Sequence, residues 1–148
     1  MFSAEEMAII AEANRILESK LRAAPVFSSP SAVKNFLKTE IAHKEHEVFV
    51  VLFLNGQHQL IVSETMFRGT IDCASVYPRE VAKAALAHNA AAVIFAHNHP
   101  SDGVEPSDAD RHITQRLTDA LALFDIRVLD HLVVGKGRVF SFAESGLI

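Results

Sequence analysis

The sequence predicts one α/β (α+β) domain built around a mixed β-sheet that helices flank. Helical patterns alternate with apolar, β-branched strand patterns along the chain, an order that is typical of helices packed on a sheet. The length of 148 residues suits one ordinary domain. The content of 49% hydrophobic and 22% charged residues is that of a globular protein.

A helix beginning at Ser3 is the first expected element. Ser3 and Glu6 have the form of a capping box, and apolar residues follow at helical spacing. The Ser- and Pro-containing stretch Pro25–Pro30 is the one internal boundary that the composition suggests. We therefore divide the chain into an N-terminal helix, residues 1–25, and a main domain, residues 26–148.

The main domain is expected to hold further helices and a set of short strands. Val48–Leu54 is rich in β-branched and aromatic residues, as is typical of a strand buried on both faces, and Asn55-Gly56 is a hairpin signal. In chain order we expect a helix over 31–42, strands over 48–54, 59–63 and 67–71, a helix over 78–90, a strand over 91–97, a helix over 107–124, and strands over 127–134 and 138–142.

Composition narrows the function classes. Fourteen basic and eighteen acidic residues give a net charge of -4, which argues against a protein that coats nucleic acid. The single cysteine, Cys73, excludes a disulfide framework and a Cys-rich zinc site, and it is typical of an inert small residue. The N-terminus is acidic, unlike a signal peptide, and the longest apolar runs are seven residues. We therefore expect a cytoplasmic protein with no membrane partner.

One segment concentrates side chains that bind metals. His97 and His99 are two residues apart at the end of an expected strand, so an extended backbone places both rings on one face. Ten residues separate His99 from Asp110, which lies in the first turn of a helix and on its sheet-facing side. A buried carboxylate is costly unless it is paired or binds a metal. Two imidazoles, one carboxylate and an open fourth position are the ligands of a catalytic zinc site.

Several of these residues also have simpler, structural interpretations. Ser107 and Asp110 have the Ser-x-x-acid form of a helix N-cap, which alone would explain both residues. Asp130-His131 suits structural hydrogen bonding or a supporting place near the metal. A zinc deaminase is excluded because it needs a Cys-x-x-Cys pair. The other histidines are expected to be ordinary polar residues: His43, His46, His58, His88 and His112.

The segment resembles the JAMM (JAB/MPN+) metalloprotease motif, with an upstream Glu, His-x-His, ten residues and Asp, and a Ser three before that Asp. The wider sequence is similar to the JAB domain of RadC-type bacterial proteins over roughly residues 26–148. The blocks that carry this likeness are 52–54, 67–71, 76–80, 96–101, 127–131 and 141–144. The resemblance implies a JAB/MPN-like mixed sheet flanked by helices, a layered architecture similar to that of cytidine deaminases.

The resemblance also implies roles for particular residues. His97, His99 and Asp110 would hold one Zn²⁺ with a water in the fourth position. Glu47 occupies the place of the general base, which would take a proton from that water and return it to the leaving amine. Ser107 matches the residue that helps to stabilise the tetrahedral oxyanion.

Two departures from the family pattern are visible. The family usually has Gly directly after His-Pro-Ser, whereas Asp102 precedes Gly103 here. Longer members carry an N-terminal segment resembling a DNA-binding helix-hairpin-helix, and this chain has the short form with one helix before Pro25. The family therefore leaves a nucleic-acid partner open, although the acids of the metal loop, Asp102, Glu105 and Asp108, disfavour one.

Two functions remain from the sequence. The first is a zinc-dependent metallohydrolase that cleaves a peptide or isopeptide amide in a peptide or protein substrate. The second is a non-catalytic metal-binding module that acts through protein or DNA partners. An apolar stripe on the first helix would suit packing on its own domain or a homo-oligomer through a second copy. The stripe consists of Met7, Ile10, Leu17 and Leu21.

Overall fold

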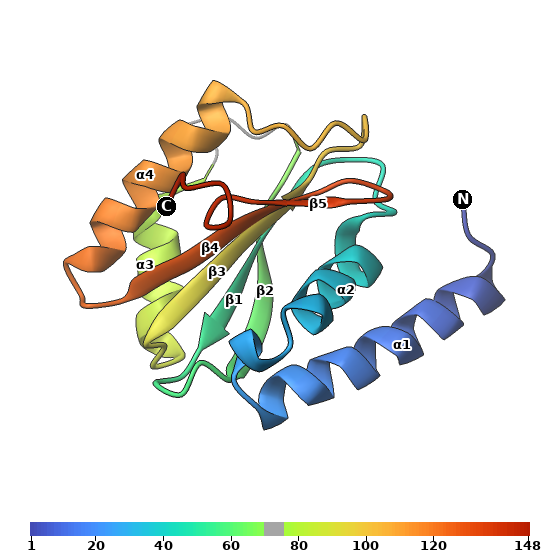
Figure 1. Cartoon of the computed structure of the whole chain (residues 1–148), viewed down its shortest axis with the longest axis horizontal. Coiled ribbons are helices and arrows are strands. Elements are labelled where there is room, and N and C mark those ends of the chain that lie inside the picture. Colours follow the sequence, from blue (N-terminus) through green and yellow to red (C-terminus); the bar gives the residue numbers. More distant parts are fainter. Residues whose placement is uncertain (70–75) are drawn as a thin grey trace.

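A twisted mixed β-sheet runs through the middle of the molecule (Figure 1). The computed structural model describes residues 1–69 and 76–148. Within these residues the sheet has five strands, in the order β2-β1-β3-β4-β5. Their bounds are β1 (Val48–Leu54), β2 (Leu60–Arg68), β3 (Ala92–Asn98), β4 (Arg127–Val134) and β5 (Val139–Ser141).

The strand pairings explain where the sheet can support a site. β1 lies antiparallel to both β2 and β3, and β4 lies antiparallel to β5. β3 and β4 are parallel, so the chain must cross over between them, and helix α4 (Asp108–Ala122) makes that crossover. The carboxyl end of β3 therefore leads through a loop directly to the N-terminus of α4.

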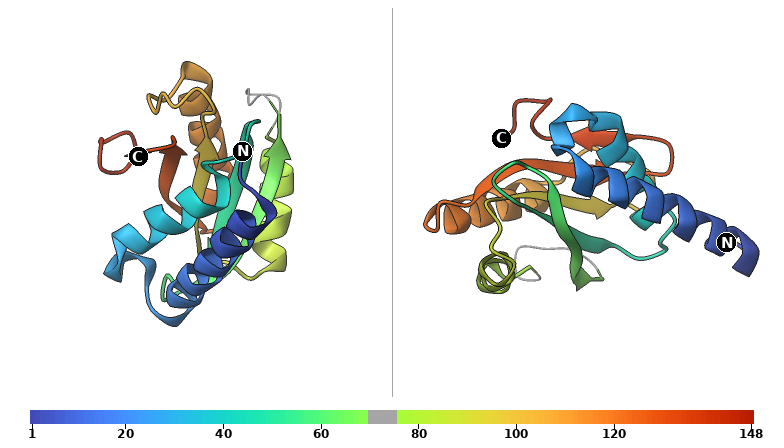
Figure 2. Two further views of the ribbon diagram at one scale, coloured as in Figure 1. Left: turned by 90° about the vertical axis from the view of Figure 1, so that its right-hand side faces the viewer. Right: turned by 90° about the horizontal axis from the view of Figure 1, so that it is seen from below.

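Helices cover both faces of the sheet, as Figure 2 shows. α1 (Ala4–Ala23) and α2 (Pro30–Ile41) lie on one face, with a short 3₁₀ turn, η1 (Val26–Ser28), between them. α3 (Pro78–Ala87) and α4 lie on the other. The expected α/β class with a mixed, helix-flanked sheet is confirmed.

β1 is buried from end to end and contributes to two cores. Val48, Val50, Leu52 and Leu54 pack in the core shared with α1 and α2. Phe49, Val51 and Phe53 pack in the core shared with α3 and α4. Alternate residues of a strand point to opposite faces, so an unbroken apolar run is what a sheet covered on both sides requires.

Most expected elements are off by one or two residues at an end, and three differ in more than that. β2 is one strand of nine residues rather than two short ones, and the end of the expected third strand, residues 70 and 71, lies outside the described residues. The loop before β2 is longer than a two-residue hairpin, and its left-handed residue is His58, with φ 60°, rather than Gly56. α3 ends at Ala87 because Asn89 adopts a left-handed conformation, with φ 56°. Cys73 also lies outside the described residues.

The first helix packs on its own domain through its C-terminal half. Leu21 is buried in the core with α2, and Leu17 packs against the same core. Asn14 lies between the helices and bonds to Glu40 and Thr39 of α2. Nearer the N-terminus, Met7 is 41% exposed. Within the part of the chain that the structure describes, no helix is both long and apolar enough to cross a membrane.

Candidate metal centre

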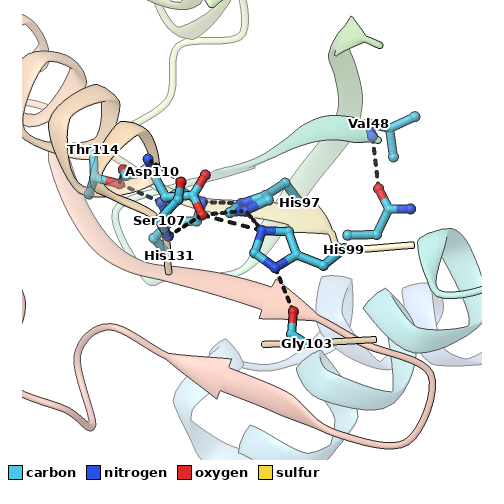
Figure 3. A network of polar contacts seen from close by, with 9 residues as sticks. Val48, His97, His99, Gly103, Ser107, Asp110, Thr114 and His131 are labelled. Carbon is cyan, nitrogen blue, oxygen red and sulfur yellow. Dashed lines mark hydrogen bonds and ion pairs between the residues drawn. The ribbon is translucent and has the colours of Figure 1, made fainter. Parts of the chain in front are cut away.

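The end of β3 and the first turn of α4 bring together His97, His99 and Asp110 (Figure 3). The Nε2 atoms of His97 and His99 are 3.0 Å apart. The Oδ2 atom of Asp110 lies 3.2 Å from Nε2 of His97 and 3.3 Å from Nε2 of His99. In the described residues this is the one group of three or more His, Cys, Asp or Glu side chains that could hold a metal ion.

The spacing of these three atoms fits a small tetrahedral cation. Zinc–ligand distances of about 2.0–2.1 Å place neighbouring ligands of a tetrahedron roughly 3.3 Å apart. The separations of 3.0, 3.2 and 3.3 Å come close to that value. Three ligands leave a fourth position for water or substrate, as in catalytic sites. The donor set therefore fits a divalent metal.

The loop after β3 orients His99. Its Nδ1 lies 2.5 Å from the carbonyl oxygen of Gly103, which can only accept, so Nδ1 carries the proton and Nε2 is free for a metal. Asp102 has φ 70°, a left-handed conformation that favours glycine, which is the residue that the resemblance leads one to expect at this place. The Asp102 carboxylate accepts a hydrogen bond from the backbone N–H of Lys136 in the β4–β5 turn. The metal loop is thus tied to the neighbouring hairpin.

His97 is held by a partner on β4. Its Nδ1 lies 2.7 Å from Nε2 of His131, which is 0% exposed. The other ring nitrogen of His131, Nδ1, lies 2.5 Å from the hydroxyl of Thr114 on α4. Burial lowers the pKa of His131 well below its ordinary value, so this ring is neutral. The sequence left two roles open for Asp130-His131: structural hydrogen bonding, or a supporting place near the metal. The structure places His131 beside the candidate ligand His97.

Ser107 is the N-cap of α4, as the Ser-x-x-acid spacing predicts. Its hydroxyl accepts from the backbone N–H of Asp110 at 3.0 Å, and Oδ2 of Asp110 accepts from the backbone N–H of Ser107 at 2.9 Å. The capping box and the metal-ligand geometry are therefore both present, and they share Asp110. Ser107 is itself exposed at the mouth of the site.

The electrostatics of the site are those of a paired carboxylate. Burial raises the pKa of Asp110, but its close contacts with the imidazoles of His97 and His99 outweigh burial and hold the pKa well below its usual range. The hydrogen bond to Asp110 is the main cause that raises the pKa of His99, and the charge of Glu47 raises it further. Asp110 is thus a carboxylate that is 3% exposed and ready to bind a cation.

Glu47 directly precedes β1, next to the metal loop. Phe49 pairs with His97 across the sheet, so the start of β1 lies beside the end of β3, and the charge of Glu47 is close enough to raise the pKa of His99. The buried side chain of Asn98 fixes this corner, since its Oδ1 accepts from the backbone N–H of Val48 at 2.8 Å (Figure 3). Its amide also donates to the carbonyl of His46. Glu47 is half-buried, as a carboxylate at the rim of a site would be.

Sequence reasoning found the three convergent residues and missed two that support them. Thr114 carries a signal in hindsight, because it lies one helical turn after Asp110 and shares its face. Asn98 lies between the two histidines in the sequence, but its side chain points to the opposite face of the strand. The sequence therefore gave no sign that Asn98 accepts a hydrogen bond from the backbone of Val48. The histidines outside the motif do not join the metal group: His43, His46, His58, His88 and His112.

Comparison with known families identifies the family of this domain. Residues 27–147 match the family described as RadC-like JAB domain. The chain belongs to this family. That membership confirms the resemblance drawn from the motif blocks, and the JAB-like α/β domain is the one that the described strands and helices form.

Several curated relatives share this domain. A UPF0758 protein of Methylibium petroleiphilum is 59% identical over 145 residues, which cover 98% of this chain and 65% of that protein. One from Chromohalobacter salexigens is 61% identical over 132 residues, covering 89% of this chain and 59% of the relative. One from Vibrio cholerae is 58% identical over 143 residues, covering 97% and 90%. The chain thus spans less than two thirds of the length of some RadC-like relatives.

Proposed function

We propose that this RadC-like JAB domain is a zinc-dependent hydrolase that cleaves a peptide or isopeptide amide bond. The observation that carries the proposal is the convergence of His97, His99 and Asp110 with Glu47 beside them. Zinc in such a site lowers the pKa of a bound water to about 7 and polarises the substrate carbonyl. An open fourth position is what distinguishes a catalytic from a structural zinc site.

The remaining chemistry is assigned to this chain's own residues. The Glu47 carboxylate accepts a proton from the attacking water and passes it to the amine nitrogen as the amide C–N bond breaks. The Ser107 hydroxyl oxygen accepts a hydrogen bond from the backbone N–H of Asp110. Its hydroxyl proton is therefore available to donate to the oxyanion that develops on the substrate carbonyl. His97, His99 and Asp110 position the metal and need not exchange protons.

Charge around the site favours a peptide over a nucleic acid. Asp102, Glu105 and Asp108 are all exposed on the loop that carries the ligands and on the start of α4, where they would repel phosphates. A groove of about 990 Å³ reaches this loop at Pro100, the residue after His99. Its walls combine apolar side chains that can contact a peptide with polar and charged ones: Met1, Phe2, Met7, Ile10, Ala42 and Pro100, with Lys38, Thr39, His43, Lys44, Glu45 and Lys136.

Metal analysis and one matched pair of variants test the proposal. Protein purified without a His-tag is expected to contain about one zinc per chain. His99→Ala should lose the metal, whereas Glu47→Gln should keep it and lose hydrolysis of the peptides that accumulate in a Glu47→Gln strain. Glu12→Gln is the control and should keep both, because this exposed carboxylate of α1 pairs with Arg15 and lies outside the groove. A native protein that binds no metal would overturn the proposal.

The same experiment addresses the alternative of a non-catalytic module with protein or DNA partners. The exposed part of α1 near Met7 is the surface that favours this alternative and, with it, a homo-oligomer. A Glu47→Gln strain indistinguishable from the native strain in every phenotype would support the module. A phenotype that equals that of a full deletion would support the hydrolase.

A further inference from the structure

A chain of hydrogen bonds joins one candidate ligand to the backbone of another. It begins at Nδ1 of His97, which lies 2.7 Å from Nε2 of His131. It continues from Nδ1 of His131 to the Thr114 hydroxyl at 2.5 Å, and from that hydroxyl to the carbonyl oxygen of Asp110 at 2.6 Å. Figure 3 shows these side chains lying together between α4 and the sheet. They come from β3, β4 and α4.

The carbonyl oxygen of Asp110, the last acceptor in this series of hydrogen bonds, determines where each of its protons lies. A carbonyl oxygen can only accept, so Thr114 gives its single hydroxyl proton to Asp110. Thr114 must then accept from His131, which places the His131 proton on Nδ1. The unprotonated Nε2 of His131 can only accept, so the proton of neutral His97 lies on Nδ1. What remains on His97 is a lone pair at Nε2, 3.2 Å from Asp110 Oδ2.

We propose that His131 and Thr114 are positioning residues that hold His97 in the tautomer able to bind a metal through Nε2. This inference rests on the metal site of the proposed function and assigns to the Asp130-His131 motif a role that the hydrolysis itself does not use. His99 reaches the same tautomer through one backbone carbonyl. His97 cannot use a loop carbonyl in the same way, because its side chain is 1% exposed and lies next to β4 rather than a loop.

The surroundings of His131 fix the ring as well as its proton. Phe142 stacks on it with ring centroids 4.7 Å apart and an interplanar angle of 18°. Phe49 and Phe95 contact it edge-on at 5.6 and 5.9 Å. A ring held on three sides by aromatic side chains cannot turn without disturbing the core, so its two nitrogens stay aimed at His97 and Thr114.

Threonine variants one helical turn apart test the inference without emptying the core. Thr114→Val keeps the volume but removes the acceptor for His131, and zinc affinity is expected to fall about 10- to 100-fold. Thr114→Ser restores the hydroxyl and should return affinity to within about threefold of the native value. Thr118→Val is the matched control, because Thr118 also bonds to a carbonyl one turn back, Thr114 O at 2.7 Å, but lies outside the His131 chain.

A second measurement, on metal-free protein, separates this inference from the proposed function. Long-range ¹H–¹⁵N NMR at alkaline pH, where imidazoles are neutral, should show His97 protonated at Nδ1 in the native protein and as a mixture in Thr114→Val. A native His97 protonated at Nε2 overturns the inference, as does a folded Thr114→Val that binds zinc as tightly as Thr118→Val. If the native protein bound no zinc, the proposed function would fail, and the NMR result would still decide the tautomer.

Discussion

Asp110 carries two tasks on one oxygen. Its Oδ2 accepts the backbone N–H of Ser107 and also lies nearest to both candidate imidazole ligands. A capping-box carboxylate in the first turn of a helix and a metal ligand are both favoured by an ionised group, so the two contacts agree in charge. The lowered pKa of Asp110 keeps it ionised at every pH at which the protein would work.

The raised pKa of His99 predicts a pH dependence of metal binding. The metal needs a neutral imidazole, so zinc must displace the proton that the Asp110 hydrogen bond retains on His99. Zinc affinity is therefore expected to fall as pH drops from 8 to 6, by up to about tenfold per pH unit for one proton. Calorimetric titration in buffers of different ionisation enthalpy would report the released proton. Affinity independent of pH and of buffer would contradict this prediction.

The raised pKa of His99 has the opposite pH dependence in its effect on the stability of the metal-free protein. The folded-state pKa of His99 lies above its unfolded value. Its protonated pairing with Asp110 therefore contributes stability that is fully present below the unfolded pKa and is lost as pH rises through the folded pKa. Metal-free protein should thus lose stability over the pH range in which it gains affinity for zinc. Urea unfolding at pH 6 and pH 8, with His99→Ala as reference, would measure the difference.

At the scale of an element, the N-terminus of α4 combines a cap with the position to which the proposed function assigns oxyanion stabilisation. Ser107→Ala should cost about 1 kcal/mol of stability, the usual effect of losing an N-cap. Ser107→Asp restores a cap acceptor but offers no proton to an oxyanion, so it should recover stability without recovering peptide hydrolysis. Chemical unfolding and hydrolysis rates on the two variants would separate the roles. Equal recovery of both quantities in Ser107→Asp would remove Ser107 from the chemistry.

The β4–β5 turn supports the metal loop through a close approach at Gly135. A Cβ at this position would lie 2.7 Å from the Asp102 carboxylate and 2.9 Å from a methyl group of Val104. Gly135→Ala should therefore displace the loop, costing about 1–3 kcal/mol of stability and weakening zinc binding. Gly137→Ala is the control in the same turn, because a Cβ there meets nothing within 4 Å. Equal midpoints of urea unfolding for the two variants would contradict the close approach.

Elements differ in how far the sequence predicts them. The run Val48–Leu54 was predictable because burial on both faces leaves an unbroken apolar pattern. β2 is an edge strand that is only partly buried and mixes polar with apolar residues. Its polar middle was therefore interpreted as a break between two strands. The metal residues were predictable because strand and helix periodicity alone place His97, His99 and Asp110 on facing sides. The place of His131 depends on the register of β4 against β3, a long-range pairing that no local pattern encodes.

The whole molecule places the candidate centre where its parts meet. β3 lies in the middle of the sheet, between β1 and β4, and α4 covers the face on which the ligands converge. His97, Asp110 and His131 are nearly excluded from solvent, whereas the loop between β3 and α4 is largely exposed. The candidate ligands are thus held mainly in the interior, next to a surface loop that is exposed to solvent.

Because the ligands belong to two elements that separate on unfolding, zinc should stabilise the whole domain. At a free zinc concentration of about 1,000 times the dissociation constant, binding to the folded state alone adds about 4 kcal/mol to the free energy of unfolding. For a chain of 148 residues this corresponds to a rise of roughly 8–16 °C in the melting temperature. Magnesium should have little effect, since it prefers oxygen ligands. Thermal unfolding of native protein, His99→Ala and the exposed control His112→Ala would measure the rise. An equal rise in His99→Ala would mean that the stabilising zinc binds away from His97, His99 and Asp110.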